Sequence, residues 1–316
     1  MTNDNNLKIF SCEAHKPLAK SIASIIGVPL GDMEIEHFSD GEINVHIKET
    51  VRGCDVFIIQ STSAPVNENM MQLLVAIDAL KRASAARITA VMPYYGYARQ
   101  DRKARARDPI TAKMVADILT TVGVDRLLTM DLHAPQIQGF FNIPVDHLLG
   151  VPILYDYFKK DYKGRDDVVL VSPDLGSVTR VRKFAEKLNL PIAIIDKRRP
   201  KNNVSEVMNI IGDVKDKKLI IIDDLIDTAG TLCNAAAALK KAGATEIRAC
   251  ATHGVLSGPA LQRITDSCLD EVLVLNTINM PDEKITGKIK TLSVAPVFAE
   301  AIERIHEDLS VSTLFI

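Results

Sequence analysis

Two adjacent carboxylates, Asp223 and Asp224, follow the apolar run at 219–222 and precede a short polar segment. That segment consists of Asp227, Thr228, Ala229, Gly230 and Thr231. Its small side chains would let a phosphate approach the backbone, and free N–H groups at a helix start favour an anion. The carboxylates suit sugar hydroxyls, or a cation shared with phosphates. The spacing predicts a phosphate-binding turn; the alternative is an acidic turn that only caps the next helix.

The elements around this turn place it at one edge of a sheet. The run at 219–222 holds three β-branched residues among four and suits a buried parallel strand. After the turn, Leu232, Ala235, Ala236 and Leu239 recur at helical spacing, and Gly243 predicts the end of that helix. Strand, tight loop and helix therefore follow one another.

Three further polar segments stand at predicted strand ends or turns. The loop at 172–177, Ser-Pro-Asp-Leu-Gly-Ser, follows the strand at 168–171. The stretch Asp131-Leu132-His133-Ala134 ends the strand at 126–131, and this position distinguishes His133 from an ordinary structural histidine. Phe38-Ser39-Asp40-Gly41-Glu42 separates two short extended runs, and its composition alone predicts a hairpin tip.

Two basic loops also follow predicted strands. The loop at 94–107 has five cations, one carboxylate and three tyrosines, and the loop at 196–201 has four cations beside one proline. Open α/β sheets bind ligands at strand ends, so polyphosphate is the preferred partner of the first loop. For the second, composition alone leaves a solvated surface loop and an anion-binding loop equally open.

An internal repeat sets the fold class. Strand, polar loop, helix and strand ending in a basic loop occur at 56–92 and again at 168–195. Alternating strands and helices predict parallel sheets flanked by helices, so the chain is an α/β protein of two similar tandem domains. We expect domains at 1–149 and 150–302, followed by a terminal segment at 303–316 whose alternation predicts a last strand.

Composition narrows the function classes. A net charge of −2 over 316 residues argues against a general nucleic-acid binder, and no apolar run approaches membrane-spanning length. Five cysteines are scattered without metal-ligand spacing, which suits a reducing cytoplasm. The polar start, Met1 to Asn6, does not have the pattern of a signal peptide.

The stretch at 217–239 resembles the signature of proteins that bind 5-phosphoribosyl 1-diphosphate, and the other segments narrow the resemblance to the ribose-phosphate diphosphokinases. It covers nearly the whole chain and implies two phosphoribosyltransferase-like domains. The implied reaction moves the diphosphate group of ATP to ribose 5-phosphate, with Mg²⁺ as cofactor, in nucleotide biosynthesis.

The resemblance also implies roles for individual residues. ATP would be bound by Phe38, Asp40, Gly41, Glu42, Arg99 and Gln100. Ribose 5-phosphate would be bound by Arg199, Asp223, Asp224, Asp227, Thr228, Ala229, Gly230 and Thr231. The diphosphate loop would be Asp174, Leu175, Gly176 and Ser177, the metal ligands His133 and Asp174, and the catalytic cations Lys197 and Arg199.

One departure lies inside these motifs, because the family usually has a second glycine where this chain has Ser177. If residue 177 has negative φ, serine keeps the N–H donor and little is lost. If it needs positive φ, strain of roughly 1–2 kcal/mol follows. Ser177 therefore leaves room for a weakly active or inactive regulatory paralogue, and a phosphoribosyltransferase is a further alternative.

The family further implies an assembly and a regulator. The segment at 38–42 would complete the ATP site of a neighbouring subunit in a homohexamer built from dimers. The terminal segment would pack on the first domain, with Ser310, Ser312, Arg52, Arg82 and Ser84 lining a regulatory site for phosphate or ADP.

Overall fold

The computed structural model describes residues 6–198, 207–281, 285 and 287–315, and it divides into two compact units. The first unit comprises residues 1–149, 277–279 and 293–316; the second comprises 150–276 and 280–292. Residues 293–302, which the sequence assigns to the C-terminal domain, therefore belong to the first unit. The reason is a non-local contact, because α8 (Ala295–His306) packs against α1 (Lys16–Ile26).

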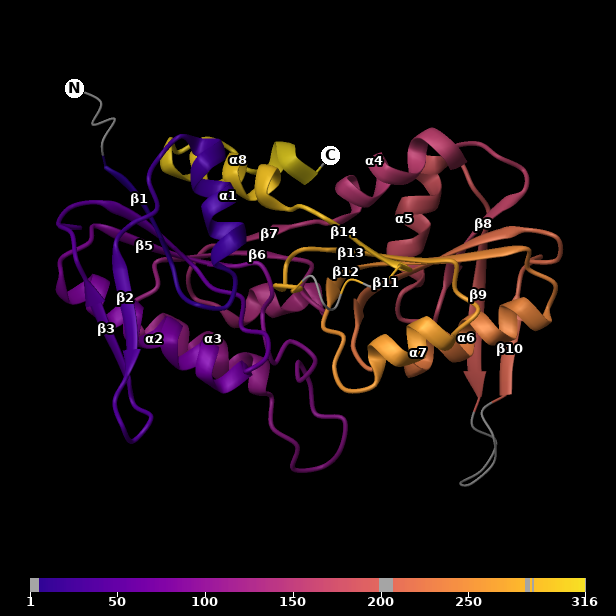
Figure 1. The fold of residues 1–316 in the computed structure, drawn as a ribbon, viewed down its shortest axis with the longest axis horizontal. Helices are drawn as coiled ribbons and strands as arrows, with labels where there is room; N and C mark the ends of the chain where they lie inside the picture. The colour runs from indigo at the N-terminus through magenta and orange to yellow at the C-terminus, as the bar shows by residue number, and fades with distance from the viewer. Residues whose placement is uncertain (1–5, 199–206, 282–284, 286, 316) are drawn as a thin grey trace. The chain divides into compact units, whose positions relative to one another are not determined.

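A parallel five-stranded sheet forms the centre of the first unit. Its order is β1 (Leu7–Ser11), β4 (Asp55–Ile59), β5 (Arg87–Met92), β6 (Arg126–Met130) and β7 (Val145–Leu148). Every residue of β4 is buried, as a strand covered on both faces requires. Figure 1 shows α1 and α8 on one face of this sheet, and α2 (Val66–Arg82) and α3 (Thr111–Val122) on the other.

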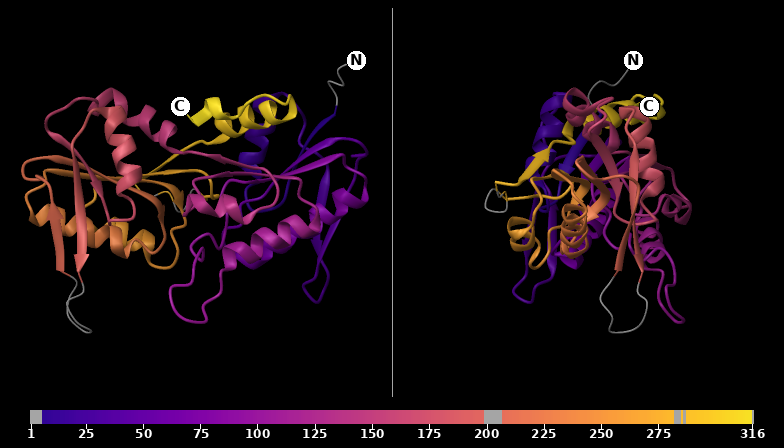
Figure 2. Two further views of the ribbon diagram at one scale, coloured as in Figure 1. Left: turned by 180° about the vertical axis from the view of Figure 1, so that it is seen from behind. Right: turned by 90° about the vertical axis from the view of Figure 1, so that its right-hand side faces the viewer.

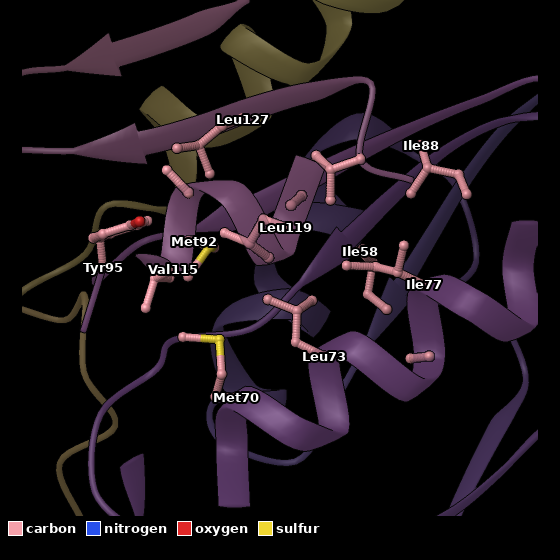
Figure 3. Close-up of a cluster of buried hydrophobic side chains, with 14 of the residues drawn as sticks. Ile58, Met70, Leu73, Ile77, Ile88, Met92, Tyr95, Val115, Leu119 and Leu127 are labelled. Carbon is pink, nitrogen blue, oxygen red and sulfur yellow. The ribbon is translucent and has the colours of Figure 1, made fainter. Parts of the chain in front are cut away.

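The core beneath α2 and α3 is continuous and apolar (Figure 3). Leu73 and Ile77 of α2 and Leu119 of α3 are fully buried against Ile58 and Leu127 of the sheet. Their spacing gives each helix one apolar face, and this burial is the main stabilisation of the layer.

The second unit contains a seven-stranded sheet whose strands are parallel except for the edge strand β10. Its order is β10 (Val207–Ile211), β9 (Ile192–Arg198), β8 (Val168–Ser172), β11 (Lys218–Ile226), β12 (Glu246–Gly254), β13 (Glu271–Leu275) and β14 (Ile289–Leu292). One face carries α4 (Val151–Tyr162) and α5 (Val178–Leu188), and the other carries α6 (Gly230–Lys241) and α7 (Ala260–Asp266), as both figures of the fold show (Figures 1 and 2). The two parallel, helix-flanked sheets confirm the predicted α/β class.

The hairpin predicted around Phe38 is present as β2 (Met33–His37) and β3 (Ile43–Ile47). The N–H of Phe38 donates to the Glu42 carbonyl at 2.9 Å. Gly41, in the turn, has φ +94°, a backbone conformation that residues with a side chain rarely adopt.

Two expected elements differ from the structure. The tail forms a 3₁₀ turn, η3 (Ser312–Phe315), where alternation predicted a strand, because no neighbouring strand pairs with it among the described residues. Asp196, Lys197 and Arg198, predicted as loop, extend β9, because they pair with the antiparallel strand β10.

A second 3₁₀ turn, η1 (Pro135–Phe140), follows His133. No helix among the described residues is long and apolar enough to cross a membrane.

Candidate active site

The carboxylates at 223 and 224 lie within a strand rather than in a loop. Pairing of β11 with β8 ends at Ile221, whereas pairing with β12 continues through Asp223 to Ile226. Beyond β8, the chain turns away into the loop at 173–177, so β11 runs on beside that loop. The predicted diphosphate loop and the predicted sugar-binding acids thus meet at the carboxyl ends of two neighbouring strands.

Side-chain contacts join the loop to the strand directly. The N–H of Ser177 donates to Asp174 Oδ1 at 2.8 Å, and the Ser177 hydroxyl donates to Asp223 Oδ1 at 3.2 Å. Arg180 of α5 lies 3.5 Å from Asp224 Oδ1. Ser177 therefore joins two carboxylates, Asp174 and Asp223, and the third, Asp224, is the next residue of the strand and lies beside Arg180.

Burial, together with neighbouring negative charge, governs the electrostatics of Asp223. Burial raises the pKa of Asp223 to about 7, and the charges of Asp224 and Asp174 add to this shift. Desolvation and like charges both disfavour the ionised form of Asp223. A bound cation or a hydrogen-bond donor would stabilise that form. Perturbed carboxylates of this kind concentrate at functional sites.

The predicted phosphate turn leads directly into α6. Ala229 has φ +58°, a left-handed conformation that costs a non-glycine residue about 1 kcal/mol. The turn is held from outside: Arg263 Nη1 donates to the Thr228 carbonyl at 3.0 Å, and the Ser257 hydroxyl donates to Asp227. A strained turn that its surroundings hold in place is typical of a ligand site.

Gly230 begins α6 where a side chain would have little room. A Cβ built there would lie 3.2 Å from Arg263 Nη1. The first N–H groups of a helix lack intrahelical partners, and the helix dipole favours an anion at that end. The turn at 227–231 therefore has the features of a phosphate site, and its binding of phosphate stays a prediction.

Residue 177 has φ −83° and ψ −6°, so the position does not require glycine. Of the two cases left open for this departure, the strained one does not apply. Leu175 and Gly176 are exposed, and Ser177 is 8% exposed.

The segments predicted to bind ATP lie in the first unit. Phe38, at the hairpin tip, is 55% exposed, and the N–H of Glu42 donates to Asp40 Oδ1 at 3.1 Å. Arg99 and Gln100 are exposed on the basic loop. The first turn of α2 anchors both segments: His37 Nε2 lies 2.6 Å from Glu68 Oε1, and the Tyr97 hydroxyl donates to Asn67.

The second basic segment is described only in part. Arg199 lies outside the described residues, and for Lys197 only the backbone is described, near the carboxyl end of β9. The strand order places β9 next to β8, so Lys197 stands on the same edge of the sheet as the loop at 173–177. Its catalytic role stays a prediction.

The predicted metal ligands belong to different units. His133 is exposed beyond the end of β6 in the first unit, and Asp174 lies in the second. Over the residues that the structure describes, no three His, Cys, Asp or Glu side chains are arranged to hold a metal ion. The pairing of His133 with Asp174 stays a prediction.

The tail residues predicted to line a regulatory site belong to the first unit. Ser310 Oγ and Ser312 Oγ lie 2.7 Å apart, and Arg304 Nη1 donates to the Ser310 carbonyl. Ser84, at φ +66°, accepts a hydrogen bond from the N–H of Gly53, next to Arg52. A regulatory role for these residues stays a prediction.

Sequence reasoning missed several supporting residues. Ser257 and Arg263 hold the phosphate turn from about thirty residues away, and Asn67 and Glu68 anchor the ATP segments. No local pattern marks them. Arg180 had one available signal, because it stands three residues after Ser177 on the first turn of a helix.

These strand ends define a class of protein before any comparison: a parallel α/β protein whose second unit carries buried carboxylates and a phosphate-type turn at the carboxyl ends of its strands. Two family models match the chain. The N-terminal domain of ribose phosphate pyrophosphokinase matches residues 7–123, and the phosphoribosyl synthetase-associated domain matches 197–316.

Relatives match over nearly the whole chain. A "Ribose-phosphate pyrophosphokinase" of Clostridium perfringens is 67% identical over 99% of this chain and 98% of its own length. Its namesake in Clostridium tetani is 68% identical over 98% and 97%. The crystal structure of phosphoribosylpyrophosphate synthetase from Mycobacterium smegmatis has a TM-score of 0.92 at 44% identity, covering 96% of this chain and all of that one. The chain belongs to the ribose-phosphate pyrophosphokinase family.

Proposed function

We propose that this protein transfers the diphosphate group of ATP to ribose 5-phosphate, giving 5-phosphoribosyl 1-diphosphate and AMP. The observation that carries the proposal is the meeting of the loop at 173–177, the acids at 223 and 224 and the phosphate turn at 227–231 at one sheet edge. Membership of the family supports it.

The second unit would hold the sugar phosphate. The 5-phosphate would sit on the turn from Asp227 to Thr231, and Asp223 and Asp224 would bind the ribose hydroxyls. The loop from Asp174 to Ser177 would wrap the diphosphate with backbone N–H groups. The anomeric oxygen forms a bond to the β-phosphorus, the bond from that phosphorus to the oxygen it shares with the α-phosphorus breaks, and AMP leaves with that oxygen while the hydroxyl loses its proton.

Other residues would bind ATP and stabilise the charge on the transferred group. Phe38 would stack on adenine, Asp40 and Glu42 would accept hydrogen bonds from ATP, and Arg99 and Gln100 would contact the nucleotide. Lys197 and Arg199 would stabilise charge on the transferred group and on departing AMP. No protein nucleophile is required, since phosphoryl transfer of this kind proceeds by positioning and charge stabilisation.

Magnesium fits the donor chemistry of this edge. Mg²⁺ prefers oxygen ligands and is usually held by one or two carboxylates together with substrate phosphates, so a cluster of three protein ligands is unnecessary. The raised pKa of Asp223 beside Asp224 and Asp174 is the electrostatic signature of a site that gains from a cation. Asp174, with His133, would hold the ion, and the ion would neutralise part of the phosphate charge.

One assay tests the function. Purified protein is given ATP, ribose 5-phosphate and Mg²⁺ without any nucleobase, and AMP is measured. Stoichiometric AMP that depends on ribose 5-phosphate is expected. A phosphoribosyltransferase would form no AMP under these conditions, and a regulatory paralogue would show turnover only with a second, active chain.

We further propose a homohexamer in which the segment at 38–42 serves a neighbouring subunit's ATP site, with phosphate or ADP as regulator. Light scattering and activity on dilution test this assembly, and full activity as a monomer would contradict it. The five cysteines are all free, which fits the reducing cytoplasm proposed as its location.

A further inference from the structure

Ser177 is used in an unusual way for a residue at the start of a helix. It is the N-cap of α5, where a serine hydroxyl commonly accepts a hydrogen bond from an N–H of the first turn. Here the side chain makes no such cap bond. The hydroxyl instead donates to Asp223 Oδ1, a residue of another element and 46 positions later in the chain.

The same residue holds two carboxylates by two different groups. Its backbone N–H donates to Asp174 Oδ1 at 2.8 Å, which any residue other than proline would do. Its hydroxyl donates to Asp223, which requires a serine or threonine among side chains of this size. The link from the loop at 173–177 to β11 therefore depends on the identity of residue 177.

The Asp223 carboxylate has one oxygen fixed by this arrangement. Oδ1 accepts from the Ser177 hydroxyl at 3.2 Å and from the N–H of Asp224 at 2.9 Å. Two donors on one oxygen select a single orientation of the carboxylate plane. The Asp223 carboxylate is therefore held in place before any ligand binds.

We infer that Ser177 is a positioning residue for ribose 5-phosphate: its hydroxyl fixes the orientation of the Asp223 carboxylate, which would bind the ribose hydroxyls. This inference rests on the proposed function, because it assigns the ribose hydroxyls to Asp223. The φ of −83° shows that glycine's conformational freedom is not needed at this position, so a side chain can act there without backbone strain.

Calorimetric titration of ribose 5-phosphate into Ser177→Ala tests the inference without requiring turnover. Alanine keeps the Cβ and the N–H bond to Asp174 and removes only the hydroxyl. The hydroxyl acts through Asp223 and does not itself bind the sugar, so its loss predicts a three- to tenfold weaker affinity, about the net worth of one ordinary hydrogen bond. ATP affinity should change by less than about twofold.

Ser177→Thr supplies the rescue and Thr265→Ala the control. Threonine restores the hydroxyl, so ribose 5-phosphate affinity should return to within about twofold of wild type. Thr265 loses a hydroxyl that bonds only within α7, and its replacement should leave both affinities unchanged. Thermal unfolding of each variant identifies any loss of folding.

The outcomes separate this inference from the proposed function. Unchanged affinity in Ser177→Ala overturns the inference, as does an equal loss for ATP and ribose 5-phosphate, or a loss that threonine does not restore. Absence of AMP formation by the wild-type chain contradicts the proposed function instead, and binding of ribose 5-phosphate still decides the role of Ser177.

Discussion

The two ends of the sheet in the second unit treat acidic residues in opposite ways. At the amino end, Glu271 is 7% exposed and lies within hydrogen-bond distance of the Tyr157 hydroxyl, within 2.5 Å of Lys290 and 3.4 Å of Arg248. Burial alone would raise the pKa of the neighbouring Glu246. The hydrogen bond from Arg248 and the positive charge of Arg248 outweigh burial and lower that pKa. At the carboxyl end, burial and neighbouring acids raise the pKa of Asp223 to about 7.

The first unit repeats the amino-end arrangement. Asp55, the first residue of β4, accepts two hydrogen bonds from Arg87 at 2.8 and 2.6 Å and lies 2.8 Å from His306. Acids that begin strands are thus neutralised and hold elements together. Asp223, at the carboxyl end of its strand, remains crowded by Asp224 and Asp174, and open α/β sheets bind their ligands at that end. We therefore expect position along a strand to separate the structural carboxylates from those that bind ligands.

The largest effect is expected from Gly230→Leu. The side chain would occupy the space of the phosphate beside Arg263, so ribose 5-phosphate affinity should fall by roughly three orders of magnitude or more, while ATP binding is retained. Calorimetry with each ligand measures this. Gly287→Leu is the control, because a Cβ there meets nothing within 4 Å. Normal binding of both ligands by Gly230→Leu would remove the turn from the site.

A pair of lysines compares the two ends directly. Lys197→Ala, at the carboxyl end of β9, should lower kcat by about two to four orders of magnitude through loss of transition-state charge stabilisation. Lys218→Ala, at the amino end of β11, removes a cation 3.6 Å from Glu246 and should leave kcat unchanged. Steady-state kinetics on both variants decides. Near-normal turnover in Lys197→Ala would exclude this residue from the mechanism.

The amino end should yield an effect on stability alone. Glu271→Gln keeps the shape of the side chain but removes the negative charge that faces Lys290 and Arg248, so the free energy of unfolding should fall by about 1–2 kcal/mol. Lys290 is half exposed, which keeps the cost moderate. Urea unfolding measures the change, and kcat should stay at the wild-type value. A loss of turnover without a loss of stability would contradict the structural role assigned to the acids at the amino end of the sheet.

The sheets and their helices could be predicted from the sequence, because β-branched runs and helical spacing are local signals. The position of Asp223 and Asp224 could not, since their strand continues only by pairing with β12. The tail shows the same limit: its alternation predicted a strand, but a strand also needs a partner. The packing of α8 on α1, which moves residues 293–302 into the first unit, joins segments at opposite ends of the chain.

The site was predictable as a set of motifs but not as a set of contacts. The phosphate turn and the diphosphate loop stand out by composition, and resemblance gave their roles. The bond from Ser177 to Asp223 joins them across 46 positions, and the support of Asp227 by Ser257 spans 30. Residue types fix which groups are available, whereas folding decides which of them meet.

The central claim is that the carboxyl-end acids cost stability and are retained for function, and Asp223→Asn tests it most directly. In the folded chain the pKa of Asp223 is about 7, whereas an unfolded aspartate titrates near 3.9. Between these values the unfolded chain has released a proton that the folded chain retains. The stability of the wild type therefore falls as pH rises through this window, and the loss is complete above pH 7.

Urea unfolding of wild type and Asp223→Asn, at pH 5 and pH 8 without ligands or divalent ions, makes the measurement, alongside AMP formation by both proteins. From pH 5 to pH 8 the wild type should lose about 2–3 kcal/mol of unfolding free energy that Asp223→Asn, which has no carboxyl group to titrate at this position, does not lose. The same variant should lose at least about a hundredfold in AMP formation. A variant with no such pH-dependent gain in stability and near-normal turnover would contradict the account.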